Sequence, residues 1–264
     1  MKIAIIGAGN LGKSIAKGLI ANDAMSSLYL TKRNTELLKE FEGSKGVTST
    51  SDNVLAVKNS DILIFAVQPS QLENILKKIE PHLTENHVII STITGYSIER
   101  IESTVGDDRF IIRAMPNTAI SVGQSMTCVA CNEKGKAKVK LALEIFNRLG
   151  RSLEIPEEQI QAATVICASG IAFWMRLIRA TTQGAIQLGF EAREAQELAM
   201  QTCFGAASLL IESGSHPEQE IDRVTTPRGC TIEGLNEMEH QGLSSSLIKG
   251  IVASFEKINQ IKKN

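Results

Sequence analysis

The first twelve residues are Met1-Lys2-Ile3-Ala4-Ile5-Ile6-Gly7-Ala8-Gly9-Asn10-Leu11-Gly12, an apolar run that ends abruptly in three closely spaced glycines. Residues 3–6 are apolar throughout, which is typical of a parallel strand that has helices on both of its faces. From residue 10 to residue 20 the apolar residues recur at helical spacing. The stretch therefore predicts a buried strand, a sharp turn and a helix in immediate succession.

The three glycines suit a dinucleotide at this turn. Gly7 permits the sharp turn, Gly9 leaves no side chain between the backbone and a ligand, and Gly12 lets the helix pack close to the strand. The unpaired N–H groups and the positive end of the helix dipole would then bind a pyrophosphate. A merely structural turn is the alternative. We expect cofactor contacts at Gly7, Gly9, Asn10, Leu11 and Gly12.

Strands and helices alternate as far as Pro156, which indicates a parallel sheet. We expect strands at 3–6, 27–31, 47–48, 61–67, 87–91, 109–114, 126–130 and 152–155, and helices at 10–20, 34–41 (capped by Asn34), 51–57 (capped by Ser51), 70–79, 97–103 and 133–149. Beyond Pro156 only helical spacing remains, at 157–168, 171–188, 193–212, 217–224, 231–240 and 243–261. The predicted fold class is α/β, with an N-terminal Rossmann-like dinucleotide-binding domain at 1–155 and an all-α C-terminal domain at 156–264.

Composition favours a soluble globular protein. The 264 residues are 43% hydrophobic and carry a formal net charge of −1, which argues against a nucleic-acid partner. The start of the chain does not resemble a secretory signal, and we expect no apolar run that approaches the roughly 20 residues of a membrane span. We therefore expect a cytoplasmic location.

The cysteines and histidines predict no metal site. Five scattered cysteines, an odd number, are typical of reduced thiols. Cys128 and Cys131 form a C-x-x-C pair, but on a strand residues three apart point to opposite faces and cannot share a metal. The four histidines are dispersed in polar surroundings, so we expect them at the surface.

The end of the second strand bears on the choice of nucleotide. A NAD-binding unit usually has an acid there, about 20 residues past the glycines, whereas this chain has Thr31-Lys32-Arg33-Asn34. A carboxylate would repel a 2′-phosphate, but cations and polar side chains bind it through charge-assisted hydrogen bonds. We therefore favour NADP(H) over NAD(H), the alternative being that Lys32 and Arg33 are ordinary surface charges.

Two further strand ends should reach the ligand crevice. Ala66, Val67 and Gln68 lie at the carboxyl end of the apolar strand at 61–67, which stops before Pro69 because proline cannot continue a central strand. Met115-Pro116-Asn117 follows the strand at 109–114. Asn117 could hold the nicotinamide end of the cofactor or the substrate, and capping of its own loop is an equal alternative.

One loop of the helical domain stands out, Thr225-Thr226-Pro227-Arg228-Gly229-Cys230-Thr231. Free N–H groups of Gly229, Cys230 and Thr231 at a helix start would bind a small carboxylate, with Arg228 adding charge. Plain helix capping by Thr226 or Thr231 is the alternative. There is no lysine between Lys140 and Lys249, and we expect no lysine general acid from this domain.

Together these motifs resemble the pyrroline-5-carboxylate reductases, the enzymes that make proline. The resemblance covers nearly the whole chain: the glycine loop, Ala66-Val67-Gln68-Pro69 (A-V-K-P in the family), Met115-Pro116-Asn117-Thr118, and the segment 222–232, DRVTTPRGCTI, which is similar to D-x-V-[ST]-[ST]-P-G-G-x-T-I. The last motif is the most specific. The resemblance implies NADPH-dependent reduction of 1-pyrroline-5-carboxylate to L-proline by an oxidoreductase that forms a homodimer, or a higher oligomer, through its helical domain.

The resemblance also implies site residues. Substrate would bind at the dimer interface through Ser169, Thr226, Arg228, Gly229, Cys230 and Thr231, with Thr231 as the catalytic hydrogen-bond donor to the ring nitrogen. Contacts to NADPH would come from Asn53, Ala66, Val67, Gln68, Pro69, Met115, Pro116 and Asn117 as well as the glycine loop and Thr31, Lys32 and Arg33.

The chain departs from the family near the expected substrate pocket. Cys167-Ala168-Ser169-Gly170-Ile171-Ala172-Phe173 replaces S-G-S-G-P-A-Y, Arg228 replaces a glycine, and Gln68 replaces the usual lysine. A related imine or keto acid is therefore an alternative substrate, as is a non-catalytic NADPH-binding regulator. A β-hydroxyacid dehydrogenase would need a lysine where the long helix offers Arg176 and Arg179, and a deazaflavin-linked reductase would need a much reduced helical domain.

Overall fold

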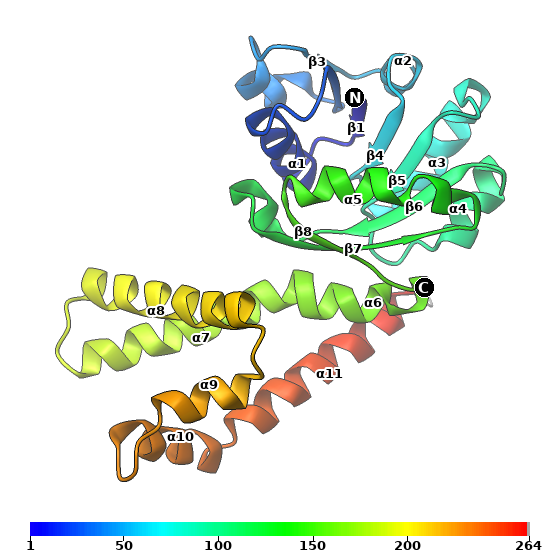
Figure 1. Ribbon diagram of the computed structural model, residues 1–264. Helices are drawn as coiled ribbons and strands as arrows, with labels where there is room; N and C mark the ends of the chain where they lie inside the picture. Colours follow the sequence, from blue (N-terminus) through cyan, green and yellow to red (C-terminus); the bar gives the residue numbers. More distant parts are fainter. Residues whose placement is uncertain (263–264) are drawn as a thin grey trace. The chain divides into compact units, whose positions relative to one another are not determined.

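The computed structural model describes residues 1–262, in two compact units that are considered separately: 1–169 with the segment from residue 255 onward, and 170–254 (Figure 1). The sheet of the first unit ends at Glu154, close to the predicted domain boundary, but the compact unit continues to Ser169. The boundary at 155/156 remains a prediction. Residues 263 and 264 of the predicted second domain lie outside the described residues.

The first unit is built on one eight-stranded sheet. Its strands are β1 (Lys2–Ile6), β2 (Ser27–Thr31), β3 (Val47–Thr50), β4 (Ile62–Phe65), β5 (Val88–Ser91), β6 (Phe110–Met115), β7 (Ser125–Cys131) and β8 (Gly150–Glu154), in the order β3-β2-β1-β4-β5-β6-β7-β8. The first six strands run parallel, whereas β7 is antiparallel to β6 and parallel to β8. The reversal follows from the segment 116–124, because a parallel crossover needs about a dozen residues or more.

Helices cover both faces of this sheet. They are α1 (Asn10–Ala21), η1 (Thr35–Phe41), α2 (Asn53–Lys58), α3 (Pro69–Ile79), η2 (Glu80–His82), α4 (Ile98–Val105), η3 (Thr118–Val122), η4 (Lys134–Ala137) and α5 (Val139–Asn147), where η marks 3₁₀ turns. Ile3 and Ile5 pack in a core with α1 and α5, while Ala4 and Ile6 pack in a second core with α2, α3 and α4. The uniformly apolar β1 is thus buried on both sides, and the predicted Rossmann-like class is confirmed.

Local chemistry corrects three expectations in this unit. The Asp52 carboxylate, and not Ser51, caps α2 by accepting from the N–H groups of Val54 and Leu55, at 2.9 and 3.3 Å. Asn34 does cap the following segment, but η1 is a 3₁₀ helix. His87 is only 6% exposed, and its ring nitrogens contact the Thr84 N–H and the Val57 carbonyl, so the expected surface position is wrong for this histidine.

The second unit is helical. It contains α7 (Gly170–Gln187), α8 (Ala192–Ser213), α9 (Pro217–Val224), α10 (Cys230–His240) and most of α11 (Leu243–Lys262), and α7 packs along α8 (Figure 1). The part of the first unit that precedes α7 ends in η5 (Glu157–Gln159), α6 (Ile160–Ala163) and the π-helical turn η6 (Thr164–Ser169). We predicted separate helices at 157–168 and 171–188, but the chain remains helical through η6 into α7.

The continuous helical stretch Glu157–Gln187 has a window of mean hydropathy 1.4, and it is the one helix of the described residues that is long and apolar enough to cross a membrane. This corrects the expectation that no run approaches that length. The core helix of a soluble protein meets the same criteria, so length and composition alone do not place the stretch in a membrane.

Candidate active site

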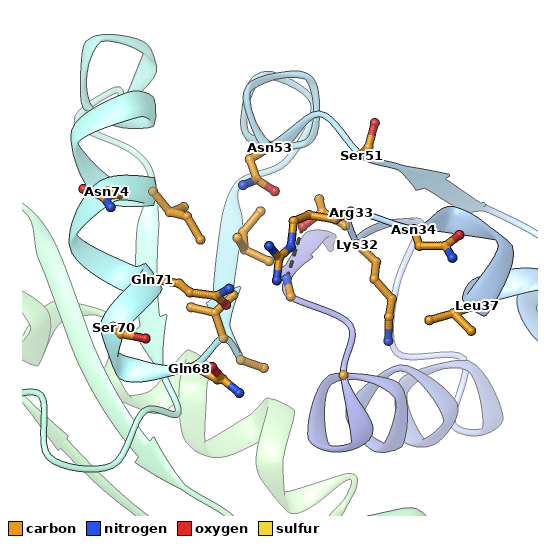
Figure 2. Close-up of a pocket in the computed structure, with 17 residues that line it drawn as sticks. Lys32, Arg33, Asn34, Leu37, Ser51, Asn53, Gln68, Ser70, Gln71 and Asn74 are labelled. Atoms are coloured by element: carbon orange, nitrogen blue, oxygen red, sulfur yellow. Dashed lines mark hydrogen bonds between the residues drawn. The ribbon is translucent and has the colours of Figure 1, made fainter.

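A cavity of about 700 Å³ lies at the carboxyl ends of β1, β2 and β4, where the strand order reverses (Figure 2). Ligands of doubly wound sheets bind at this position. The cavity is lined by nine of the predicted cofactor residues, Gly7, Gly9, Thr31, Lys32, Arg33, Asn53, Ala66, Val67 and Gln68. The other seven do not line it: Asn10, Leu11, Gly12, Pro69, Met115, Pro116 and Asn117.

The glycine loop is held tightly against its neighbours. Gly7 has φ +93°, and a Cβ there would lie 2.3 Å from Val67 Cγ1. A Cβ on Gly12 would lie 2.7 Å from the Gly7 carbonyl oxygen, whereas beside Gly9 there is open space. A side chain is therefore excluded at Gly7 and Gly12 by close packing, and Gly9 leaves room for a ligand to approach the backbone.

Thr31 holds this loop in place. Its hydroxyl accepts from the Gly7 N–H at 3.1 Å, and its carbonyl accepts from the Ala8 N–H at 2.8 Å. Thr31 lines the cavity, but its polar atoms are already engaged with the loop. These two hydrogen bonds attach the glycine loop to the end of β2.

The start of α1 can receive an anion. Gly9 is the N-cap residue, and within the described part of the chain no side chain caps this helix. The N–H groups of the first helical turn have no partner within a helix, and the helix dipole makes this end positive. The site therefore fits a diphosphate, which supports a dinucleotide in the cavity.

The two cations after β2 have different surroundings. Lys32 Nζ donates to the Ala8 carbonyl at 3.0 Å and so binds the glycine loop. Arg33 is exposed, and Figure 2 shows its side chain reaching over the cavity toward the side from which Asn53 projects. Arg33 is thus the better placed of the two to meet an anionic group in the cavity.

The wall opposite Arg33 was not predicted. It is formed by the first turns of α3, and Figure 2 shows polar side chains there. Residues 71, 74 and 75 recur at helical spacing directly after a strand end, a signal that could have placed one face of α3 on the crevice. Asn34, which belongs to the polar segment expected at the 2′-phosphate, also lines the cavity, and the unpredicted lining residues are Ile6, Leu37, Ser51, Ser70, Gln71, Asn74 and Ile75.

Asn117 makes the contacts of a loop cap. Its Oδ1 accepts from the Ala119 N–H at 3.0 Å, and its Nδ2 donates to the Cys167 carbonyl at 3.0 Å. Its backbone N–H donates to Ser125 Oγ at 3.1 Å, and the neighbouring Met115 is only 3% exposed. The capping alternative is therefore what the structure shows for Asn117, and cofactor contacts by this loop remain a prediction.

The predicted substrate loop is a tight turn in the second unit. The Gly229 N–H donates to the Thr226 carbonyl at 2.9 Å, and Arg228 occupies the left-handed region with φ +60°. A Cβ on Gly229 would lie 2.4 Å from Thr226 Oγ1. Proline followed by a residue with positive φ is the pattern of a type II turn, which usually has glycine where this chain has Arg228.

This turn leads directly into α10, whose N-cap residue is Gly229. Among the residues described, no side chain caps this helix, so the capping alternative for Thr226 and Thr231 is wrong. The N–H of Gly229 is used within the turn, which corrects the expectation that it is free. The first N–H groups available to an anion are those of Cys230 and Thr231. Ser169, the sixth predicted substrate residue, ends the first unit and is exposed.

The described residues contain no group of three His, Cys, Asp or Glu side chains that could hold a metal. The Cys131 pKa is raised, mainly by burial, and Cys128 contacts Cys167 instead of Cys131. Beside the cavity, Lys13 and Lys17 lower the pKa of the Glu40 carboxyl to about 2. These two ion pairs join α1 to η1, the segment that contributes Leu37 to the lining of the cavity.

Two family models match the chain. The one described as pyrroline-5-carboxylate reductase dimerisation matches residues 157–261. The one described as NADP oxidoreductase coenzyme F420-dependent matches residues 2–95, which include all the residues that line the cavity. The chain thus joins an NADP(H)-dependent oxidoreductase domain to a helical region that matches the dimerisation model of pyrroline-5-carboxylate reductases.

Named relatives extend this similarity over the whole chain. Pyrroline-5-carboxylate reductase 1 of Dictyostelium discoideum is 49% identical over 97% of the chain, although the chain spans only 49% of that protein's length. Pyrroline-5-carboxylate reductase 2 of the same organism is 44% identical, with 97% of the chain and 91% of the relative covered. The NADP-bound structure of Plasmodium falciparum pyrroline carboxylate reductase superimposes with a TM-score of 0.86 at 25% identity, over 99% and 98% of the two chains. The chain belongs to the pyrroline-5-carboxylate reductase family.

Proposed function

We propose that this protein reduces 1-pyrroline-5-carboxylate to L-proline with NADPH. The observation that carries the proposal is the turn at Thr226–Gly229, which leaves the first N–H groups of α10 without a side-chain cap in the described chain. A helix start of this kind binds a carboxylate, and the turn lies in the segment most similar to the reductase signature. The relatives' names add support, with 44% identity over nearly the full length of one of them.

NADPH would occupy the cavity at β1, β2 and β4 and supplies the hydride when bound. Its diphosphate would lie at Gly9 and the start of α1, and its 2′-phosphate near Arg33. The end of β2 carries Thr31 where NAD-binding units usually have an acid, which favours NADPH over NADH. The polar face of α3 would line the other side of the nucleotide.

The substrate carboxylate would accept hydrogen bonds from the N–H groups of Cys230 and Thr231, with Arg228 adding charge. The Thr231 hydroxyl would donate to the ring nitrogen of the neutral imine and accept from its N–H once the imine is protonated, and Ser169 would contribute a second hydroxyl. Cyclic imines are readily protonated, so the protein need not supply a strong acid. Most of the rate enhancement would then come from positioning the ring against the cofactor.

A substrate comparison tests this proposal. We expect rapid oxidation of NADPH with 1-pyrroline-5-carboxylate, and roughly a hundredfold lower kcat/KM with 1-pyrroline, which has the same ring but lacks the carboxylate. Turnover of β-hydroxy or keto acids instead would identify a β-hydroxyacid dehydrogenase. NADPH binding without turnover of any of these compounds would identify a non-catalytic regulator.

We also propose a homodimer formed through the helical unit. This unit exposes large apolar side chains, among them Trp174 (58% exposed), Leu188 (83%) and Phe204 (63%), and such exposure marks an interaction surface. The match to a dimerisation model over residues 157–261 adds support. Light scattering should give at least twice the chain mass of 28.6 kDa, and a monomer at micromolar concentration would contradict the proposal.

A further inference from the structure

Cys128 and Cys167 are brought together in the first unit from segments far apart in sequence. Cys128 lies on β7, and Cys167 lies in the π-helical turn η6. Their sulfur atoms are 3.9 Å apart, within hydrogen-bonding distance for thiols. The surroundings are apolar, with Met115, Ala130 and Ile160 in the same cluster. Each thiol is therefore the main hydrogen-bonding partner of the other.

The two thiols differ in access to solvent. Cys128 is only 4% exposed, whereas Cys167 is partly exposed. The Cys128 thiol can donate to the Cys167 sulfur, which lowers the Cys167 pKa to about 7, while the hydrogen bond and burial raise the Cys128 pKa. The more accessible sulfur is thus the one that ionises first, and the thiolate is the reactive form of cysteine.

We propose that Cys128 and Cys167 form an oxidant-sensitive dithiol site, in which hydrogen peroxide converts the pair into an intramolecular disulfide. The Cys167 thiolate attacks one peroxide oxygen, the O–O bond breaks, and the released hydroxide takes up a proton to form water. Cys167 is now a sulfenic acid. The Cys128 sulfur attacks the Cys167 sulfur, an S–S bond forms as the S–O bond breaks, and the oxygen leaves as a second water with the two remaining protons. Two thiols are oxidised and one peroxide is reduced.

The geometry favours this pair over the C-x-x-C pair. Disulfide formation needs an S–S distance of about 2.05 Å, so the two sulfurs must approach by about 2 Å from 3.9 Å. Cys167 lies in η6, a short π-helical segment, and such irregular turns inside helices are frequent at functional sites. Cys131 follows Cys128 by three positions on one strand, so its side chain points to the opposite face.

Peptide mapping tests the site without cofactor or substrate, so its outcome is independent of the proposed reaction. The full-length protein is reduced, desalted, treated with hydrogen peroxide, alkylated and digested with trypsin. Cleavage after Arg113, Lys134, Arg151 and Arg176 places Cys128 in peptide 114–134 and Cys167 in peptide 152–176. We expect these peptides to appear linked, with the loss of two hydrogens, before Cys203 or Cys230 is oxidised, and dithiothreitol to separate them.

Two variants identify the sulfur atoms. Peptide 114–134 also contains Cys131, so Cys131→Ser should leave the cross-link unchanged. Cys128→Ser should abolish the cross-link and leave a sulfenic acid on Cys167 that dimedone traps. A Cys167 that stays fully alkylated while Cys230 is oxidised, or a cross-link lost in Cys131→Ser, would overturn the proposal. If Cys128→Ser does not fold, the cross-link in the wild-type protein and in Cys131→Ser still identifies Cys128 as the partner of Cys167.

Discussion

Lys32 and Arg33 are neighbours in sequence but have different partners, and this difference gives a test of cofactor choice. Lys32 donates to the Ala8 carbonyl, whereas Arg33 is exposed at the cavity. Arg33→Asp should weaken NADPH binding about tenfold, because a charge-assisted hydrogen bond is replaced by repulsion of the 2′-phosphate. NADH, which lacks that phosphate, should bind nearly as before when both affinities are measured by fluorescence titration.

A matched control is Lys45→Asp, which makes the same charge change in an exposed turn that does not line the cavity. It should leave the affinities for NADPH and NADH within about twofold of the wild-type values, since exposed charges beyond a Debye length of about 10 Å are screened. Equal weakening of NADPH and NADH by Arg33→Asp would refute the assignment of Arg33 to the 2′-phosphate.

Arg228 has a backbone conformation that is unfavourable for a residue with a side chain. Its φ of +60° costs an L-residue about 1–2 kcal/mol, and glycine avoids this cost but loses about 0.5–1 kcal/mol more entropy on folding. Arg228→Gly should therefore be about as stable as the parent protein, or about 1 kcal/mol more stable, in urea unfolding. If the guanidinium binds the substrate carboxylate, the KM for 1-pyrroline-5-carboxylate should rise about tenfold.

Arg228→Lys separates charge from conformation, because it keeps both a cation and the unfavourable φ. It should retain most of the substrate affinity and none of the gain in stability. Faster turnover in Arg228→Gly would show that Arg228 impairs proline formation, and an unchanged KM would show that its guanidinium does not bind the substrate carboxylate.

At the scale of elements, Glu40 joins η1 to α1 beside the cavity through Lys13 and Lys17. Its folded pKa of about 2 lies below the ordinary 4.5, so the pairing stabilises the fold above pH 4.5, and this contribution is lost as pH falls through 2. Partly exposed pairs contribute little, so Glu40→Gln should lower the free energy of unfolding at pH 7 by about 0.5 kcal/mol. Chemical denaturation at pH 7.0 and pH 3.5 checks this.

The difference between Glu40→Gln and wild type should be smaller at pH 3.5 than at pH 7.0, and smaller again in 0.5 M salt. A larger difference at the lower pH would contradict the assigned direction of the pKa shift. Lys39→Gln serves as a control, because its pairing with Glu36 lies within η1 and does not join two elements.

Strands were predictable from sequence where burial on both faces of the sheet requires apolar residues. The strands at 27–31 and 87–91 are short apolar runs between turn residues, and the structure has strands at Ser27–Thr31 and Val88–Ser91. The reversed direction of β7 depends on chain length between strands and not on its own residues. The π-helical turn at Thr164–Ser169 has the same helical spacing as its neighbours, so periodicity could not reveal it.

The cavity was predictable only where local sequence motifs form it. Its glycine loop and the end of β2 are local motifs, but its opposite wall comes from α3, whose polar face has an ordinary surface composition. His87 was misplaced because polar residues precede it in sequence, whereas its buried ring contacts the carbonyl of Val57, which lies 30 residues away. Contacts between distant segments, such as Cys128 with Cys167, leave no local signal.

At the scale of the whole molecule, the proposed reaction converts 1-pyrroline-5-carboxylate into L-proline, and the amount of product can be compared with the NADPH consumed. Purified protein is incubated with NADPH and 1-pyrroline-5-carboxylate, and chiral chromatography measures the amino acid formed against the NADPH consumed. The proposed function predicts one L-proline for each NADPH oxidised. NADPH that remains unconsumed, or is oxidised without formation of proline, would contradict it.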